Sequence, residues 1–215
     1  MTNYFSINNF AFYAFGNGVS WLEVWGTLFG IVAVVLTAFE KISSWPIGIL
    51  NVILLFFLFY QSNLYADMFL QIFFFVTNLL GWWQWSNPKE GFGNQNNQLI
   101  VSYLDNSNRL YVVILSIIGT LVLGYVTSHL HLWLPSLFPS PAAYAYSDTF
   151  VMSCSIIAQI LMTHKKIENW ILWIVVDIVA ALIYFYKSLF LLSIEYALFC
   201  VIAAYGFYSW KRAMK

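Results

Sequence analysis

Charged residues are scarce in this chain of 215 residues, since Asp, Glu, Lys and Arg make up only 8%, against about a quarter in soluble domains. Apolar residues make up 61%, and the mean hydropathy is +0.76. Nine basic and nine acidic residues leave a formal net charge of zero, so nothing in the charge indicates a nucleic-acid surface or an acidic or basic tail. The composition therefore indicates an integral membrane protein.

Other absences narrow the chemistry. The two cysteines, Cys154 and Cys200, lie in apolar segments, where a structural disulfide is not expected. The chain has no phosphate-binding GxxxxGK[ST], no HExxH and no GxSxG motif, so ATP-driven transport and hydrolase chemistry have no support. His129 and His131 have no Cys or carboxylate cluster beside them, and we expect no metal site and no cofactor. Residues 1–20 contain no Lys or Arg, so a cleavable signal peptide is not expected.

Seven apolar stretches approach the roughly 20 residues that a membrane-spanning helix needs. They cover about residues 21–39, 45–61, 65–85, 110–130, 146–163, 170–187 and 189–210. Residues 1–20 are expected to form an interfacial segment, with a short interfacial helix from Asn8. The predicted fold is an all-α membrane protein with seven transmembrane helices.

The sequence contains an internal repeat at an offset of 125 residues. This offset superposes Lys41 on Lys166, Trp45 on Trp170, Gly81 on Gly206 and Trp85 on Trp210. The predicted parts are a first three-helix repeat (21–85), a polar cytoplasmic loop (86–109), a linker helix with an outer loop (110–145) and a second repeat (146–212). Because the repeats begin four spans apart, they share one orientation. Parallel repeats of this kind indicate a transporter whose site lies between them, near the bilayer midplane.

The basic residues predict the orientation. With seven spans, eight of the nine fall on one side and only Lys187 falls on the other. The eight are Lys41, Lys89, Arg109, Lys165, Lys166, Lys211, Arg212 and Lys215. The positive-inside rule then places the N-terminus outside and the C-terminus in the cytoplasm.

One face of the span at 170–187 carries the most informative side chains. Trp170, Trp173, Asp177, Ala181 and Tyr184 follow one another at steps of three or four residues and so share one helical face. A carboxylate at this depth costs roughly 2.5–3.5 kcal/mol on insertion scales and needs a partner. No basic residue is available at its depth, which favours a polar network, protonation or a cationic ligand. Two indoles and a carboxylate suit a planar cation; alternatively, Trp170 is an interfacial anchor and Asp177 bonds a neighbouring helix.

The first repeat carries different chemistry, because Val52 aligns with Asp177, although Trp45 and Asn51 occupy comparable places. Gln71 and Gln159 could bind a carboxamide or hydroxyl groups, or could simply join helices. The acids Glu23, Glu40, Asp67, Asp148 and Glu195 are interpreted as solvated helix ends. The candidate substrate-binding residues are Trp170, Trp173, Asp177, Gln159, Tyr184, Gln71, Asn51 and Trp45.

Several of these motifs resemble the PnuC family of bacterial vitamin transporters. They are the Trp170 and Trp173 pair with Asp177, the Leu-Tyr-Ala-Asp of residues 64–67, and the Gly-Trp-Trp-Gln-Trp of residues 81–85. The resemblance implies facilitated uptake of nicotinamide riboside, an NAD precursor, across the inner membrane, with trapping by phosphorylation in the cytoplasm. It also implies a 3+1+3 fold similar to SWEET sugar transporters, and a homotrimer. Nicotinamide riboside carries a pyridinium cation, which agrees with the face at Asp177; thiamine, carried by other members of the family, is also a planar cation and is not excluded.

Three alternatives stay open from the residues. The same pocket could carry thiamine or another vitamin. Asp177 could carry a proton in a symporter. The chain could also be an integral membrane enzyme or a structural subunit, although neither would need the repeat. We expect a transporter that is not an enzyme and that alternates access around a midplane site.

Overall fold

The computed structural model describes residues 6–61, 65–88, 91, 93, 98–136, 141–142, 144–186 and 190–214. Within these ranges the side chains of residues 17, 65–67, 69 and 190–192 are not described. Lys89, Lys187 and Lys215 therefore lie outside the described residues, as do Leu64 and the side chains of the Tyr-Ala-Asp sequence that follows it.

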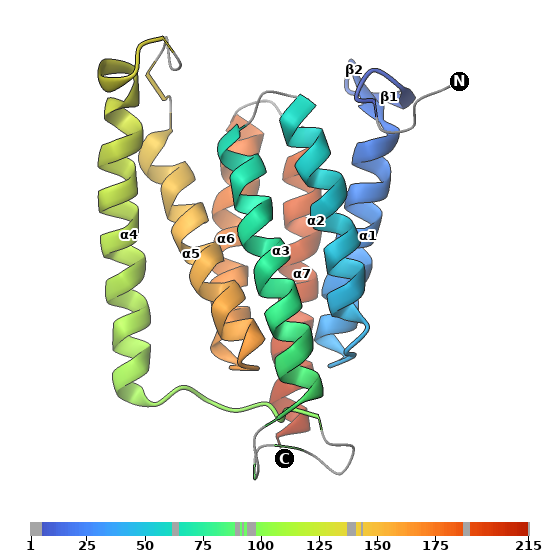
Figure 1. Cartoon of the computed structure of the whole chain (residues 1–215), viewed down its shortest axis with the longest axis vertical. Helices are drawn as coiled ribbons and strands as arrows, with labels where there is room; N and C mark the ends of the chain where they lie inside the picture. Colours follow the sequence, from blue (N-terminus) through green and yellow to red (C-terminus); the bar gives the residue numbers. More distant parts are fainter. Residues whose placement is uncertain are drawn as a thin grey trace.

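Seven helices dominate the structure (Figure 1). They are α1 (Trp21–Ala38), α2 (Ser44–Gln61), α3 (Tyr65–Ser86), α4 (Asn106–Trp133), α5 (Ala145–Thr163), α6 (Glu168–Tyr186) and α7 (Phe190–Ala213). Five of them, α1, α2, α4, α5 and α6, are long and apolar enough in their described residues to cross a membrane. The expectation of an all-α protein of seven helices is confirmed, while only five are shown to be capable of spanning.

Six of the helices form a closed ring. In order around it, α1 packs on α2, then α3, α5, α6 and α7, and α7 returns to α1. Helix α4 packs mainly on α5 and stands at the edge of the bundle (Figure 1). We call the ring segments α1–α3 and α5–α7 the first and second units.

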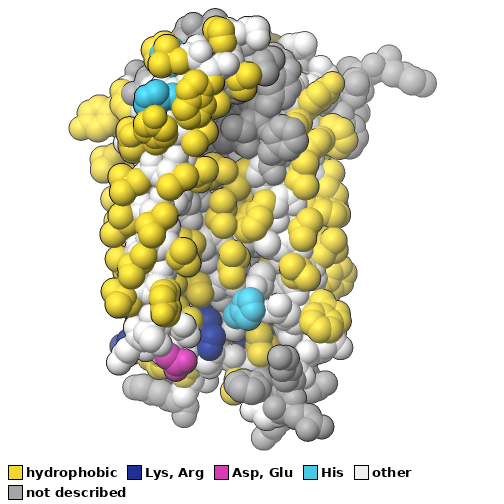
Figure 2. Space-filling model, turned by 60° about the vertical axis from the view of Figure 1, so that its left-hand side comes forward, with side chains coloured by type: hydrophobic (Ala, Val, Ile, Leu, Met, Phe, Trp, Pro, Cys, Tyr) yellow, Lys and Arg dark blue, Asp and Glu magenta, His cyan; other side chains and the backbone are white. Residues whose placement is uncertain are grey.

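The two ends of the bundle differ in charge. Following the orientation predicted from the sequence, we call the end with the α1–α2 and α5–α6 turns and the C-terminus the inner end. The opposite end, with the start of α1, is called the outer end (Figure 1). Hydrophobic side chains cover the flank that includes α4, and the Lys, Arg, Asp and Glu side chains visible there gather at the inner end (Figure 2). Leu110, Val113, Ile117 and Leu121 of α4 are each more than half exposed on such a surface, as expected of a helix that faces lipid.

The N-terminal segment is a β-hairpin, and the predicted interfacial helix from Asn8 is wrong. Strand β1 (Phe10–Ala14) pairs antiparallel with β2 (Asn17–Ser20). The turn between them places Phe15 and Gly16 at φ +51° and +85°, the left-handed values that two-residue hairpin turns need. A Phe-Gly turn in a stretch rich in aromatic residues favours strands over a helix, and the helical prediction overlooked it.

Helix α1 follows the hairpin without a break. Ser20 and Glu23 form a capping box, in which Glu23 Oε2 accepts from the Ser20 backbone N–H at 2.7 Å and Ser20 Oγ accepts from the Glu23 N–H at 3.3 Å. Glu23 is therefore a helix cap as well as a partly solvated acid.

The predicted linker helix at 110–130 is found as α4, with its first turn four residues earlier, at Asn106. That turn is polar and lies outside the apolar run, which is why hydropathy missed it. Contacts of Arg109 with Asn106 and with Glu168 of α6 hold it in place. Part of the predicted loop 86–109 is thus helical.

Candidate functional site

The face of α6 (Glu168–Tyr186) that the sequence predicts to bind substrate is directed into the helix bundle. Its exposed residues, Ile171, Val175, Ile178 and Leu182, lie on the opposite side, where an apolar surface meets lipid. Trp173, Asp177 and Tyr184 follow one another along the inward side at helical spacing. We call these three residues the α6 face.

Asp177 lies at the middle of α6, nine residues from either end. Its side chain is buried, with 4% of the residue exposed, and within the described part of the chain no hydrogen bond or ion pair reaches its carboxylate. It also lines a crevice of about 280 Å³ between α6 and α7 that opens toward the lipid-facing residues Ile178 and Leu182; Ala181, Ala197 and Cys200 line the rest of it. A buried carboxylate without a protein partner is costly, so this position calls for a partner from outside the described residues.

Aromatic rings stand on both sides of Asp177 along α6. Trp173, one turn toward the inner end, has a buried indole N–H for which the described residues offer no acceptor. Tyr184, two turns toward the outer end, lies against Tyr196 of α7, with ring centroids 5.2 Å apart and planes at 33°. The α6 face therefore combines a π surface, an unused donor and a carboxylate, the groups that hold a planar cation.

The three predicted amides divide into two kinds. Gln71 of α3 and Gln159 of α5 are buried, at 6% and 7% exposure, and no hydrogen bond to the described residues occupies either side chain. Asn51 of α2 donates from Nδ2 to the Gly26 carbonyl of α1 at 2.8 Å. Asn51 is thus engaged in joining two helices, whereas the glutamines are available to a ligand.

Trp45 and Trp170 lie at the inner end in matching tryptophan packing. Trp45 lies on Gly81, where an added Cβ would come within 2.2 Å of the indole, and Trp170 lies likewise on Gly206, at 2.6 Å. Trp85 meets Trp45 edge-on at 5.1 Å and Trp210 meets Trp170 at 5.4 Å. We call these four indoles the tryptophan cluster. Trp45 and Trp170 are 2% and 0% exposed, so their role in binding stays a prediction, and this packing favours the anchoring role for Trp170.

The sequence reasoning missed how the two units are joined. Trp85 of the first unit donates from Nε1 to the Met162 carbonyl of the second at 3.1 Å, and Trp210 of the second donates to the Thr37 carbonyl of the first at 2.9 Å. Thr37 and Met162 are also 125 residues apart. The signal in the sequence is the 125-residue offset, which relates both the donors, Trp85 and Trp210, and the acceptors, Thr37 and Met162.

An ion pair completes the junction. Lys165 Nζ lies 2.7 Å from Glu40 Oε2, and the two residues are again 125 positions apart. The interpretation of Glu40 as merely a solvated helix end is therefore incomplete, because its side chain, 26% exposed, is paired with Lys165. Burial lowers the pKa of Lys165 from its ordinary value, and the Glu40 carboxylate opposes that shift.

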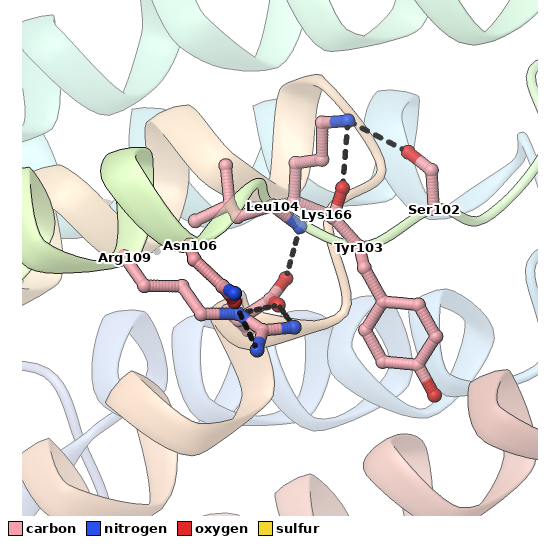
Figure 3. Close-up of polar contacts among 7 residues, drawn as sticks. Ser102, Tyr103, Leu104, Asn106, Arg109 and Lys166 are labelled. Atoms are coloured by element: carbon pink, nitrogen blue, oxygen red, sulfur yellow. Dashed lines mark hydrogen bonds and ion pairs between the residues drawn. The ribbon is translucent and has the colours of Figure 1, made fainter.

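A strap formed by residues 98–105 crosses the α5–α6 turn (Figure 3). Lys166 Nζ donates to Ser102 Oγ at 2.9 Å and to the Tyr103 carbonyl at 3.2 Å, and the backbone of Ser102 bridges to residues 165 and 167. The Leu104 N–H and Arg109 both reach the Glu168 carboxylate. The strap thus fixes the polar loop to the second unit.

Comparisons with known proteins agree on one family. The family model described as nicotinamide mononucleotide transporter matches residues 20–212. The nicotinamide riboside transporter PnuC of Escherichia coli is 31% identical, covering 97% of this chain and 94% of that protein. The riboflavin/roseoflavin transporter RibM of Streptomyces davaonensis is 21% identical, covering 95% of this chain and 91% of that protein. The crystal structure of the vitamin B3 transporter PnuC superposes with a TM-score of 0.67 at 27% identity, covering 90% of this chain and 81% of that one.

Proposed function

The chain belongs to the nicotinamide mononucleotide transporter family, and on that premise we propose that it carries nicotinamide riboside, an NAD precursor, into the cell by facilitated diffusion. It is similar over nearly its whole length to a transporter of that compound. The chain is also similar, at 21% identity, to a riboflavin/roseoflavin transporter, so the choice of substrate rests on the pocket.

The α6 face is the observation that supports nicotinamide riboside as the substrate. Asp177 is buried at mid-helix without a partner among the described residues, and Trp173 and Tyr184 stand one and two turns away. Nicotinamide riboside has a pyridinium ring with a permanent positive charge, which the carboxylate and the indole can both hold. Gln71 and Gln159, buried and without hydrogen bonds to the described residues, would take its carboxamide and ribose.

Calorimetry of the detergent-purified protein tests this proposal. We expect nicotinamide riboside to bind and thiamine, nicotinamide and riboflavin to compete poorly. If thiamine alone binds, the site still takes a planar cation but the substrate is thiamine. If riboflavin alone binds, the substrate is uncharged, and the positive charge no longer explains the role of Asp177. Uptake into liposomes that contain only this protein then separates a transporter from a membrane enzyme or a structural subunit.

A proton-coupled mechanism is the second candidate, and the isolation of Asp177 favours it. A carboxylate without a protein partner inside a membrane can be neutralised by a proton as well as by a cation. Uptake at equal pH on both sides decides between the two mechanisms. Facilitated diffusion predicts the same initial rate with and without a pH gradient, and symport predicts a rate that rises with the inward proton gradient.

The ring suggests how transport proceeds. We propose a 3+1+3 arrangement of parallel repeats, similar to SWEET transporters, in which α3 and α7 also cross the membrane and α4 is the linker. The 125-residue offset between matching contacts of the two units supports it. Access would alternate as one unit rocks against the other, with the N-terminus outside and the C-terminus in the cytoplasm of a bacterial inner membrane. The basic residues at the inner end support that orientation.

The lipid-facing surfaces support two further proposals. A homotrimer would bury part of the exposed apolar flank of α4, and light scattering in detergent measures its mass. The β1–β2 hairpin would rest in the outer membrane interface, because Phe12, Tyr13 and Phe15 are 49%, 73% and 65% exposed and residues 6–22 have no charge. Quenching of a fluorophore at position 13 by brominated lipids would be strong at the interface and absent in a hairpin that stays in water.

A further inference from the structure

We propose that Glu40 and Lys165 form an inner latch, an ion pair that keeps the inner ends of the two units together and must part for a solute to leave toward the C-terminal side. The latch rests on the proposed function only for its role in transport, since its opening is a property of the protein without any solute. It adds two residues that determine the transport step and that do not belong to the α6 face.

The latch lies where the units meet. Glu40 is in the turn between α1 and α2, and Lys165 is in the turn between α5 and α6. Both residues have left-handed backbones, with φ +57° and +52°, a conformation that is uncommon for residues other than glycine. The same unusual turn, repeated at the same offset, presents an acid from one unit and a base from the other.

Lys165 is held in a dry position. Only 2% of its side chain is exposed, and its ammonium group lies 4.6 Å from the centre of the Trp85 ring and 2.7 Å from the Leu99 carbonyl in the strap. Removing one partner of a buried pair leaves an uncompensated charge, which is strongly unfavourable. The closed latch is therefore the stable arrangement for Lys165.

Glu40 has access to water. It lines an open cavity of about 630 Å³ at the inner end, between the strap and Ala213 and Met214 at the end of α7, and 26% of its side chain is exposed. Water can therefore solvate Glu40 as the pair separates. An ion pair with one buried and one solvent-accessible partner is stable when closed and can still separate. If both partners were buried, separating them would be far more costly.

The tryptophan hydrogen bonds lie on the same boundary. The ring centroids of Trp85 and Trp210 lie 5.7 Å apart, and each indole N–H donates a hydrogen bond to a backbone carbonyl of the other unit. Separation of the inner ends must break both bonds together with the ion pair. The structure is thus closed at its inner end, and the latch is the charged part of that closure.

Hydrogen exchange measured by mass spectrometry tests the opening of the latch without a solute. Glu40→Gln should speed exchange about tenfold in the opposite unit, at residues 162–170, and Lys165→Met should do the same at residues 36–45; tenfold corresponds to about 1.4 kcal/mol of opening free energy. The charge-swapped variant, Glu40→Lys with Lys165→Glu, should recover part of the protection. Glu168→Gln is the matched control, because it breaks the Arg109–Glu168 pair of 2.9 Å, which does not join the two units.

Two results would overturn the latch: exchange that rises only in the substituted turn, or an equal rise across the units in Glu168→Gln. The charge-swapped variant keeps the test valid if a single substitution gives aggregated protein.

A crosslink tests the role in transport. Cysteines at positions 40 and 165, joined by a short reducible thiol crosslinker, should lower liposome uptake of nicotinamide riboside at least tenfold, and reduction should restore it. The unsubstituted protein with the same reagent controls for Cys154 and Cys200. Full uptake by the crosslinked protein would show that the latch does not part during transport. A lack of uptake by the unsubstituted protein would contradict the proposed substrate instead, and the exchange result would still stand.

Discussion

The two units share their packing and differ in their chemistry. In each, a tryptophan at the start of the second helix lies on a glycine of the third, and another tryptophan four residues after that glycine meets it edge-on. The hydrogen bonds from the indole N–H groups of Trp85 and Trp210 to the opposite unit also match between the two units. Matching contacts at the inner end therefore build the junction between the units.

The middle of the bundle is where the units diverge. The first unit has Gly48 where the second has Trp173, and an added Cβ at Gly48 would lie 2.4 Å from Asn78 Oδ1. The second unit has Ala203 where the first has Asn78, and Trp173 packs against the cluster that contains Ala203. Relative to the first unit, the second unit has a larger residue on its second helix and a smaller one on its third, which makes room for an indole in that unit only. Trp173, that indole, is one of the predicted binding residues.

The largest expected effect comes from the shared glycines. Gly81→Ala and Gly206→Ala should each destabilise the protein by about 3 kcal/mol, because the new methyl group overlaps a buried indole and cores tolerate overpacking poorly. Thermal unfolding of the purified variants measures the loss. Gly26→Ala is the control, since its Cβ would meet only the flexible Leu55 at 3.1 Å. Losses that differ by more than about 1.5 kcal/mol between Gly81 and Gly206 would break the equivalence of the units.

Asp177→Asn should give the next largest effect, on binding and not on folding. Loss of a charge-assisted contact of about 2 kcal/mol weakens affinity for nicotinamide riboside about thirtyfold by calorimetry, while the unfolding temperature stays the same or rises. Asp148→Asn removes an equal charge from the exposed outer part of α5 and should leave affinity unchanged. Equal affinity in both variants would remove Asp177 from the site.

The sequence predicts the helices and the repeat well, because hydropathy and the Lys, Trp and Gly matches are local or periodic signals. It identifies Asp177 as a buried acid, since a charge in an apolar span is rare whatever surrounds it. It does not separate Trp173 from Trp170, which share a helical face but differ in whether a glycine from another helix lies beneath them. That distinction depends on how α6 meets α7.

The ion pair between the units escaped prediction for a related reason. Glu40 and Lys165 lie at helix ends, where charges are common and cheap, and neither is unusual alone. Only the shared offset, together with the close approach of the two turns, makes them partners. The hairpin was missed because propensity rules for an aromatic stretch were outweighed by the expectation of a helix at a membrane surface.

The indole hydrogen bonds should contribute less than the glycine contacts and equally in both units. Trp85→Phe and Trp210→Phe each remove one N–H donor and leave a buried carbonyl, at Met162 and Thr37 respectively, so each should cost about 1 kcal/mol of unfolding free energy. Urea or thermal unfolding compares the two. Trp83→Phe is a suitable control because that indole is 64% exposed; a cost confined to one of the two paired variants would show that the reciprocal bonds are unequal.

Asn51→Ala gives the smallest effect and the sharpest contrast between structural and binding amides. Loss of the bond to the Gly26 carbonyl should lower stability by about 0.6 kcal/mol, the average for side-chain hydrogen bonds between membrane helices, and should leave affinity for the riboside unchanged. Gln159→Ala breaks no hydrogen bond to a described residue, so it should leave the stability unchanged and lower the affinity for the riboside. If Asn51→Ala lowered affinity as much as Gln159→Ala does, Asn51 would belong to the site together with Gln71 of the same unit, and its assignment as a purely structural amide would have to be given up.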